Sequence, residues 1–546
     1  MMKNKILLIV ITLLGILILG GCDLMATIDN EQENLPELDY VIMVNSDVKL
    51  PLTNFNTLNP IYSDNFYYYH FSKLIFESLF TYDESYRIIP QLASNWSINQ
   101  DGSKILINLR EDVYFHNGNK FTSDDVVYTI NTMKRASDNS IYYKLLNGIT
   151  PGNVDKSIIS AQKLDDYSLE ITVGKNANFV LDTLTFPIIS SSLGEGGLSI
   201  EDYDVIGTGP YKFVEYVKFK EIKLEAFEDY REGSPEIKYI IGKIFEDEEL
   251  ILTAFETGKL NVSGSIGVDW DKYVHNPRVD IKEYVTADFD ALSFNHNNPL
   301  FQGENGIILK KSIMYGIDRQ ELISKIYLGH GTQTDTPIHP DHYLSSSNSS
   351  QYGYTPQRSL ELLDSMTFEE EDPLKREDYE NLSLKLLVNS NNDDKIKVAE
   401  MIKSNLSNIG INIIIESVSE DQGLEYSNRL LSGNYDIAIV SWKQSIIQKF
   451  DHLFFENNIG ISNTSRFIDD EFESLLAEIS LYNNESDNLL KYDVFQKEFT
   501  GKLPYGILMY RNRALLIDSN IKGDLSPNFF NLYNGLSKSY LIMRTN

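Results

Sequence analysis

The sequence predicts an α/β protein with more than one domain, and three observations support this fold class. The chain has 546 residues, which is more than a single hydrophobic core usually holds. Its apolar fraction of 42% and aromatic fraction of 12% supply enough side chains for packed cores. Between residues 382 and 441, strand-like and helix-like patterns alternate in the order β-α-β-α-β.

The alternating segment predicts a parallel sheet with right-handed crossovers, because helices return each strand to the same direction. Ligands of such sheets bind beyond the carboxyl ends of the strands, and here the last strand ends at Ser441 and Trp442. Gly410 is expected to stop the first helix. The expected elements are a strand at 382–386, a helix through 399–409, a strand at 411–415, a helix at 421–431 and a strand at 436–440.

Three further elements are expected before this segment. The apolar run at 40–44 reads as a buried strand. Residues 92–109 have the alternation of a hairpin, with the turn signal Asp101-Gly102. Thr122 is expected to cap a helix, and the acidic residues that follow it suit the positive end of the helix dipole.

The composition excludes several classes of function. A net charge of −31 without a basic stripe argues against nucleic-acid binding. The sequence contains no Walker A pattern and no G-x-S-x-G elbow, and Pro210 interrupts the glycine pattern that begins at Gly207. We therefore expect no enzymatic activity, no catalytic residues and no cofactor.

The histidine pair in the segment 337–342 allows a metal alternative. His339, Asp341 and His342 could share a metal ion, but Pro340 makes the segment a loop and no third strong ligand is adjacent. We favour a solvated loop and expect no metal site.

The N-terminus predicts export. Lys3 and Lys5 precede an apolar run that is short for a membrane-spanning helix, which is typical of a secretory signal. Leu19-Gly20-Gly21-Cys22 resembles the bacterial lipobox, which implies cleavage before Cys22 and lipidation of its thiol. Residues 1–21 would then be a lipoprotein signal peptide and 22–38 a polar tether. The alternative is an N-terminal membrane anchor that stays attached.

Motifs along the mature chain resemble one family. The segments 109–118 (LREDVYFHNG) and 121–126 (FTSDDV) resemble the signature of the family 5 extracellular solute-binding proteins, the oligopeptide, dipeptide and nickel-binding receptors of ABC importers. Further matches follow in the family's order: Thr57–Pro60, Phe76–Leu79, Pro90–Ala93, Gly207–Tyr211, Ser293–Asn295, Tyr315–Arg319, Tyr435–Ile437 and Ser441–Trp442.

The resemblance implies a two-lobed flytrap of the periplasmic-binding-protein-like type II, class C, with an extra inserted domain. Two crossing strands would join the lobes. The implied boundaries are 39–79, 207–291 and 505–546 for domain I, 80–206 for domain II and 292–504 for domain III.

The resemblance also implies a function. The chain would be the substrate-binding lipoprotein of an ABC importer, a monomer anchored on the extracytoplasmic face of the cell membrane. It would capture peptides between its lobes and deliver them to permease subunits. The ligand-binding residues expected on this basis are Asn59, Ser441, Trp442, Lys443, Ser445 and Asp451.

One departure from the family pattern affects the ligand. Peptide-binding members commonly carry an aspartate three residues after the tryptophan, where it pairs with the ligand's ammonium group. This chain has Ser445 there, and Asp451 or Glu456 could substitute. Lys443 could receive a carboxylate, or it could be a solvated lysine.

The departure leaves other functions open. One is a receptor of the same fold for a non-peptide solute, such as a sugar or a metal chelate, or for a signalling peptide. The others are a lipid-anchored hydrolase and a structural lipoprotein.

Overall fold

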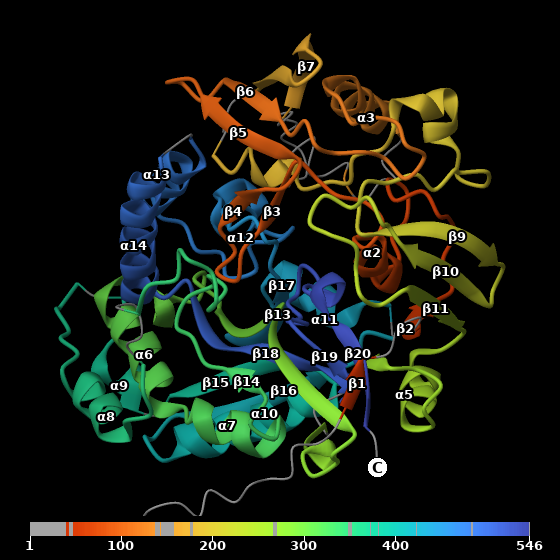
Figure 1. Ribbon diagram of the computed structural model, residues 1–546. Coiled ribbons are helices and arrows are strands. Elements are labelled where there is room, and N and C mark those ends of the chain that lie inside the picture. Colours follow the sequence, from red (N-terminus) through yellow and green to blue (C-terminus); the bar gives the residue numbers. More distant parts are fainter. Residues whose placement is uncertain are drawn as a thin grey trace, which may run out of the picture. The chain divides into compact units, whose positions relative to one another are not determined.

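The computed structural model describes residues 40–42, 47–136, 142, 158–174, 178–265, 270–347, 352–371, 373–380, 382–421, 423–481 and 484–544 (Figure 1). The signal segment, the tether and Cys22 lie outside the described residues. Strand β1 (Tyr40–Ile42) pairs antiparallel with β20 (Tyr540–Arg544). The elements below belong to the compact unit formed by residues 44–540.

The largest sheet has seven strands and contains the β-α-β-α-β segment. Strand β15 is parallel to both β16 and β17, and helices α10 (Asp393–Ser407) and α11 (Glu425–Ser432) connect them, so the predicted alternation is confirmed. The short strand β14 (Gly331–Thr332) also pairs with β18 (Tyr505–Asp518) but stands outside the linear order of the other six strands. The strand order is β12 (Val262–Gly264), β18 (Tyr505–Asp518), β13 (Val279–Phe294), β17 (Ile437–Lys443), β15 (Ser383–Asn389) and β16 (Asn412–Val418).

Local chemistry explains where α10 begins and ends. The side chain of Asn392 accepts a hydrogen bond from the Lys395 N–H and caps the first turn. Gly410 has a φ of 81° just after the helix, a conformation that glycine adopts without steric cost. Ile402 and Leu406 are buried against the sheet, and each such side chain stabilises the fold by about 1.5–3 kcal/mol.

Helices cover both faces of the large sheet, and each face has its own hydrophobic core. One core is aliphatic and includes residues of α6 and α10. The other is aromatic: the ring of Phe454 lies 5.2 Å from that of Phe472 and 5.9 Å from that of Phe499. The helices are α6 (Gly303–Gly316), α7 (Arg319–Ile326), α8 (Pro356–Asp364), α9 (Arg376–Glu380), α12 (Asp451–Phe454), α13 (Asp470–Ser480) and α14 (Glu485–Lys502).

Two four-stranded sheets and a hairpin form the rest of the unit. The first sheet has the order β2 (Asp47–Thr53), β11 (Tyr239–Phe245), β10 (Glu221–Ala226) and β9 (Tyr211–Val217), with α2 (Phe66–Ser72) and α5 (Glu248–Glu256). The second has the order β5 (Ala93–Ile98), β6 (Lys104–Leu109), β8 (Ser168–Val173) and β7 (Ile158–Asp165), with α3 (Ser123–Arg135). Strands β3 (Phe80–Tyr82) and β4 (Ile88–Pro90) form the hairpin.

The expected hairpin and helix cap are confirmed, but the buried strand expected at 40–44 is not. β5 and β6 form the expected antiparallel hairpin, with Gly102 at a φ of 71° in its turn. Thr122 caps α3, and its N–H donates to the Asp125 carboxylate over 2.8 Å. Strand β1 lies within the apolar run expected at 40–44, but its central residue Val41 is 54% exposed, so the prediction that this strand is buried is wrong there. Residues 43–46 lie outside the described residues.

We call residues 47–261 with 519–540 the two-sheet side, and residues 295–504 the large-sheet side. The long strands β13 and β18 run between these sides and pair antiparallel along most of their length. Their register is interrupted between Val285 and Phe289 and again between Asp290 and Ala291.

Two glycines let the chain pack tightly on the two-sheet side. The Gly209 N–H donates to the carbonyl of Ile75 over 2.8 Å. A Cβ atom on Gly207 would lie 1.9 Å from that same carbonyl oxygen. The Gly-Thr-Gly-Pro-Tyr motif therefore serves backbone packing, which agrees with its failure to complete a dinucleotide fingerprint.

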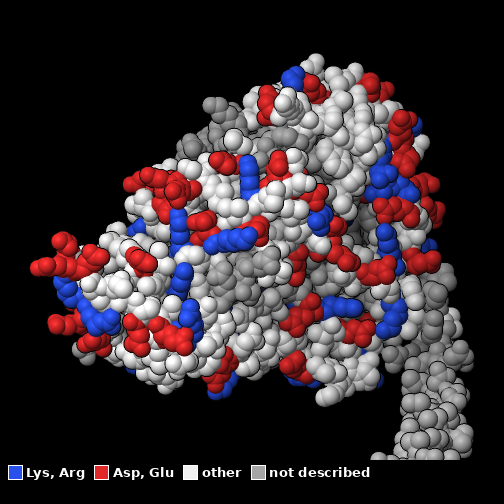
Figure 2. Space-filling view, turned by 90° about the vertical axis from the view of Figure 1, so that its left-hand side faces the viewer, with Lys and Arg blue, Asp and Glu red and all other residues white. Residues whose placement is uncertain are grey.

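Acidic side chains lie across the face shown in Figure 2, with basic side chains between them. This distribution agrees with the net charge of −31. Within the part of the chain that the structure describes, no helix combines the length and apolarity needed to span a membrane.

Candidate ligand-binding site

The carboxyl end of β17 lies beside the strands that join the two sides. Trp442 and Lys443 end this strand and pair with Phe289 and Asp288 of β13. The Trp442 ring is partly buried, 6.3 Å from the ring of His452. Its indole N–H is enclosed and has no hydrogen-bond acceptor among the described residues. Lys443 is exposed.

Ser441 belongs to an ion-pair network. Arg511 on β18 donates to the Asp290 carboxylate on β13 through Nε over 3.0 Å and through Nη2 over 2.7 Å. The Ser441 hydroxyl donates to Asp290 and accepts from Arg511. The hydroxyl is therefore engaged in holding β13, β17 and β18 together.

Asn59 lies inside the two-sheet side. It is 0% exposed, and its amide nitrogen donates to the carbonyls of Gly197 over 3.0 Å and Ser199 over 2.9 Å. Its amide oxygen accepts from the Ile61 N–H. These bonds occupy the amide and join two distant segments of chain, which gives Asn59 a structural role.

Ser445 and Asp451 lie in the turn and helix after β17. The Ser445 hydroxyl accepts from the Ile447 N–H over 3.2 Å. Asp451 begins α12 and is partly buried. Burial raises the pKa of its carboxyl, while the charge of Lys449 and a hydrogen bond with Ser480 act in the opposite direction.

The interpretation of residues 337–342 as a solvated loop is wrong. His339 is 0% exposed and His342 is 4% exposed. The His339 ring lies 5.2 Å from Tyr86 and 4.9 Å from Phe529, both on the two-sheet side. Among the described residues, no group of three or more metal-ligating side chains was found.

An aromatic wall with a charge at each end lines the two-sheet side, and the sequence analysis missed it. The Lys73 ammonium lies 3.7 Å from the ring centre of Phe530 and 4.5 Å from that of Tyr69. Phe530 lies 4.8 Å from Tyr82, edge to face. The Tyr82 hydroxyl donates to the Asp182 carboxylate over 3.0 Å. The wall therefore runs from a cation to a carboxyl group.

Charges from the large-sheet side act on both ends of this wall. Burial, reinforced by the positive charges of Lys73 and Lys443, lowers the pKa of His70 well below its ordinary value. Burial raises the pKa of Asp182 to about 7, although the Tyr82 hydrogen bond and Lys449 both act to lower it. The positive charges of Lys443 and Lys449 therefore disfavour protonation of His70 and of Asp182, respectively.

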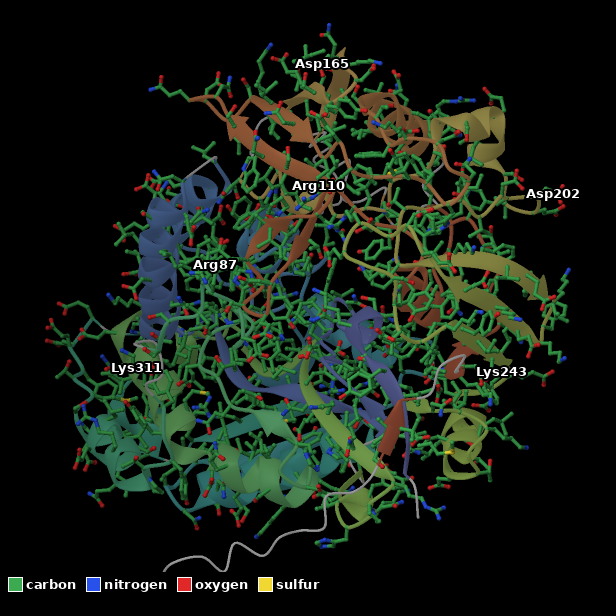
Figure 3. The ribbon with its side chains drawn as sticks, viewed as in Figure 1. Arg87, Arg110, Asp165, Asp202, Lys243 and Lys311 are labelled. Atoms are coloured by element: carbon green, nitrogen blue, oxygen red, sulfur yellow. The ribbon has the colours of Figure 1, made fainter. Side chains whose placement is uncertain are left out.

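The β3–β4 hairpin contacts the large-sheet side. The Tyr343 N–H donates to the Ser85 carbonyl over 2.9 Å. Arg87 pairs with Glu485 at the start of α14 over 3.0 Å, and its guanidinium lies 4.6 Å from the centre of the Tyr343 ring. Figure 3 shows Arg87 between the hairpin and α14.

Asn178 makes a second contact between the two sides. Its amide donates to the Ile479 carbonyl over 2.6 Å and exchanges hydrogen bonds with the Asn488 amide over 2.9 and 3.1 Å. Phe179 packs against the aromatic core of the large-sheet side. Asn178, Asp182, Arg87 and Glu485 also line a cavity of about 410 Å³. The two sides thus meet in a closed arrangement.

The sequence alone did not predict the aromatic wall. Lys73, Tyr82, Asp182 and Phe530 come from four distant segments, and no periodicity relates them. The sequence feature that could have indicated it is the clustering of aromatic residues near polar ones, as in Phe66–Lys73 and Phe529-Phe530.

The chain is similar to bacterial solute-binding proteins of known sequence. The family model described as bacterial extracellular solute-binding proteins, family 5, middle, matches residues 87–453. Heme-binding protein A of Haemophilus influenzae is 23% identical over 474 residues, which cover 82% of this chain and 84% of that protein. Oligopeptide-binding protein AppA of Bacillus subtilis is 22% identical over 480 residues, which cover 85% and 86%.

Solved structures share the two-lobed α/β fold. The ABC transporter substrate-binding protein CtaP from Listeria monocytogenes has a TM-score of 0.73 at 21% identity, over 91% of this chain and 100% of that chain. HbpA2 from Haemophilus parasuis has a TM-score of 0.73 at 19% identity, over 92% and 100%. AppA from Bacillus subtilis, in complex with a nonapeptide, has a TM-score of 0.60 at 20% identity, over 92% and 100%.

Proposed function

Because the chain belongs to the family 5 bacterial extracellular solute-binding proteins, we propose that it captures peptides between its two lobes and delivers them to the permease of an ABC importer. The peptide-binding relatives AppA and the dipeptide-binding protein of Escherichia coli support the ligand class. The observation that carries the proposal is a cavity of about 410 Å³ between the two sides, which Asp182 lines at the end of the aromatic wall. The protein binds its solute and does no chemistry on it.

The acidic end of the wall supplies a partner for a peptide's ammonium group. Asp182 and Asp451 both have pKa values raised by burial, and Lys449 is the lysine that acts on both. A second positive charge would stabilise the ionised form of both carboxyls. These residues replace the aspartate that the family pattern places at Ser445.

The other expected site residues receive two kinds of role. Trp442 would donate its unpartnered indole N–H to a ligand acceptor, which removes the cost of an enclosed polar group. Lys443 and Ser445 would line the cleft beside it. Ser441 and Asn59 would stabilise the structure around the site without contacting the ligand, since their polar groups already form hydrogen bonds within the protein.

The arrangement in the cell follows from the same proposal. Domain I would comprise 39–79, 207–291 and 505–546, domain II 80–206 and domain III 292–504. Cys22 would carry the lipid that anchors the monomer to the extracytoplasmic face of the cell membrane, after removal of residues 1–21. The tether at 22–38 would let the lobes reach the permease.

Native mass spectrometry of the mature protein tests this function. Mild purification should retain a series of peptide masses, because an extended peptide is held by main-chain pairing that tolerates varied side chains. Calorimetry with trialanine and N-acetyl-trialanine then tests the ammonium partner. We expect the Asp182→Asn variant to lose most of the preference for the free amine. A single non-peptide adduct, such as heme or a metal chelate, would instead indicate a receptor of the same fold for another solute.

Replacing Asn178 by alanine is expected to weaken the affinity for any peptide so identified by about 10-fold. The closed form would lose three hydrogen bonds and leave the Asn488 amide unpaired, at a cost of about 1–3 kcal/mol. Calorimetry measures the affinity, and small-angle scattering measures the closure. Asn412→Ala, on an exposed position of β16, is the matched control. Equal affinities of both variants would show that Asn178 does not contribute to closure.

A further inference from the structure

Tyr86 has a strained backbone at the tip of the β3–β4 hairpin. Its φ is 56°, in the left-handed region that glycine adopts freely and that is unfavourable for a bulky residue. The Asp83 N–H donates to the Arg87 carbonyl over 3.0 Å, and the Tyr86 N–H donates to the Asp83 carbonyl over 3.1 Å. The turn therefore has a conformation at position 86 that suits glycine, and contacts outside the hairpin must stabilise a tyrosine there.

Those contacts come mainly from the large-sheet side. The Tyr86 ring lies 5.2 Å from the ring of His339, edge to face, and 6.2 Å from that of His342, nearly parallel to it. On its own side, Phe529 lies 4.8 Å from Tyr86 and 4.9 Å from His339. We call the rings of His339, His342 and Phe529 the aromatic socket. Tyr86 is 3% exposed, and separation of the two sides would return its ring to water.

The two histidines of the aromatic socket are fixed by local hydrogen bonds. His339 Nδ1 accepts from the Asp341 N–H over 3.2 Å, and His342 Nδ1 accepts from the Leu344 N–H over 3.2 Å. Burial lowers the pKa of His339 to about 4 and that of His342 to about 3, so both rings are neutral at pH 7 and pack as aromatic groups. This part of the socket is therefore held by its own chain and does not require a bound solute.

Two contacts beside the aromatic socket join the same parts of the molecule. The Tyr343 N–H donates to the Ser85 carbonyl over 2.9 Å. The Arg87 guanidinium lies 4.6 Å from the centre of the Tyr343 ring and pairs with Glu485 over 3.0 Å. The side chains of this ion pair are 43% and 59% exposed, and exposed ion pairs contribute little. The insertion of Tyr86 is therefore the main contact between the hairpin and the large-sheet side.

We propose that the β3–β4 hairpin is a latch that holds the two sides closed without a bound solute, by the insertion of Tyr86 into the aromatic socket. Opening would expose this ring and would leave the left-handed turn without the contacts that stabilise it. The closed form is therefore populated before a solute arrives, and the solute has less of the free energy of closure to supply. This inference goes beyond the proposed function, because it does not depend on which solute the protein captures.

Small-angle scattering of the solute-free mature protein tests the latch. Bound solute is removed by unfolding in urea and refolding, and native mass spectrometry verifies its removal. The wild type should scatter as the closed arrangement. Tyr86→Gly should have a larger radius of gyration, because it removes the ring while glycine keeps the turn. Tyr86→Phe retains the ring and should remain closed. His342→Ala removes one wall of the socket from the large-sheet side and should also expand the protein, so the test does not depend on the folding of one variant.

Phe219→Gly is the matched control. Phe219 also has a positive φ, of 58°, in the turn between β9 and β10, but its side chain is 64% exposed. This variant should keep the wild-type radius of gyration. The latch is refuted if the solute-free wild type is as expanded as Tyr86→Gly, or if both Tyr86→Gly and His342→Ala keep the wild-type radius. Equal expansion of Phe219→Gly would also refute it, because the effect would then come from the turn and not from the socket.

Discussion

Replacing Arg319 by methionine is expected to lower the free energy of unfolding by about 3–5 kcal/mol, because it leaves a buried charge without its partner. Arg319 and Asp335 pair over 2.7 Å with side chains that are each 1% exposed. The guanidinium also donates to the carbonyls of Thr334 over 2.9 Å and Ile507 over 2.8 Å, and to that of Tyr352. One side chain therefore joins α7, β18 and two loops.

Urea unfolding measures this effect through the midpoint and the slope of the transition. Arg358→Met removes an arginine from α8 whose side chain is 53% exposed and pairs with Glu361. The expected cost of that control is about 0–1 kcal/mol. Arg319→Met/Asp335→Leu removes both charges and should recover part of the loss. If Arg319→Met costs no more than the control, the buried pair is not a major source of stability.

Replacing Gly207 by alanine is expected to cost about 3 kcal/mol or more, in the range of severe packing defects. The added methyl group would lie 1.9 Å from the Ile75 carbonyl oxygen and 2.7 Å from its carbon. Both are backbone atoms, so no side-chain rotation can relieve the overlap. The Gly207 carbonyl also accepts from the His116 N–H over 2.9 Å, which joins this segment to a second one.

The yield of soluble protein and the melting temperature report this defect. Gly196→Ala is the matched control, since a Cβ there would meet nothing within 4 Å. That variant should melt within a few degrees of the wild type. If Gly207→Ala has the same melting temperature as Gly196→Ala, the segments that contain Gly207 and Ile75 can move apart with little loss of stability.

The sequence predicted those parts of the fold that local patterns encode. The strands and helices from β15 to β17 were found because period-two and helical spacings leave their apolar residues on one face. The structural roles of Gly207 and Arg319 could not be predicted from the sequence. Both residues were noted only as parts of family motifs. The packing role of Gly207 requires the position of Ile75, and the ion-pair role of Arg319 requires the position of Asp335.

The candidate site was less predictable because its groups meet only in the folded chain. Trp442 and Lys443 were expected at the ligand because their motif ends a strand, and they do end β17; their contact with a ligand stays a prediction. Asn59 was expected at the ligand, yet its amide is engaged and fully buried. Lys73 and Asp182 carried no motif, and they stand on one wall because Phe530 and Tyr82 pack between them.

The ladder of β13 and β18 restricts how the lobes can move. Two separate flexible linkers would permit twisting and sliding, but two strands hydrogen-bonded to each other must deform as one ribbon. Such a ribbon bends most readily where its bonding is interrupted, and here that is between Val285 and Phe289. We therefore expect the lobes to move mainly by rotation about an axis across this break, with the largest displacements at the edges farthest from it.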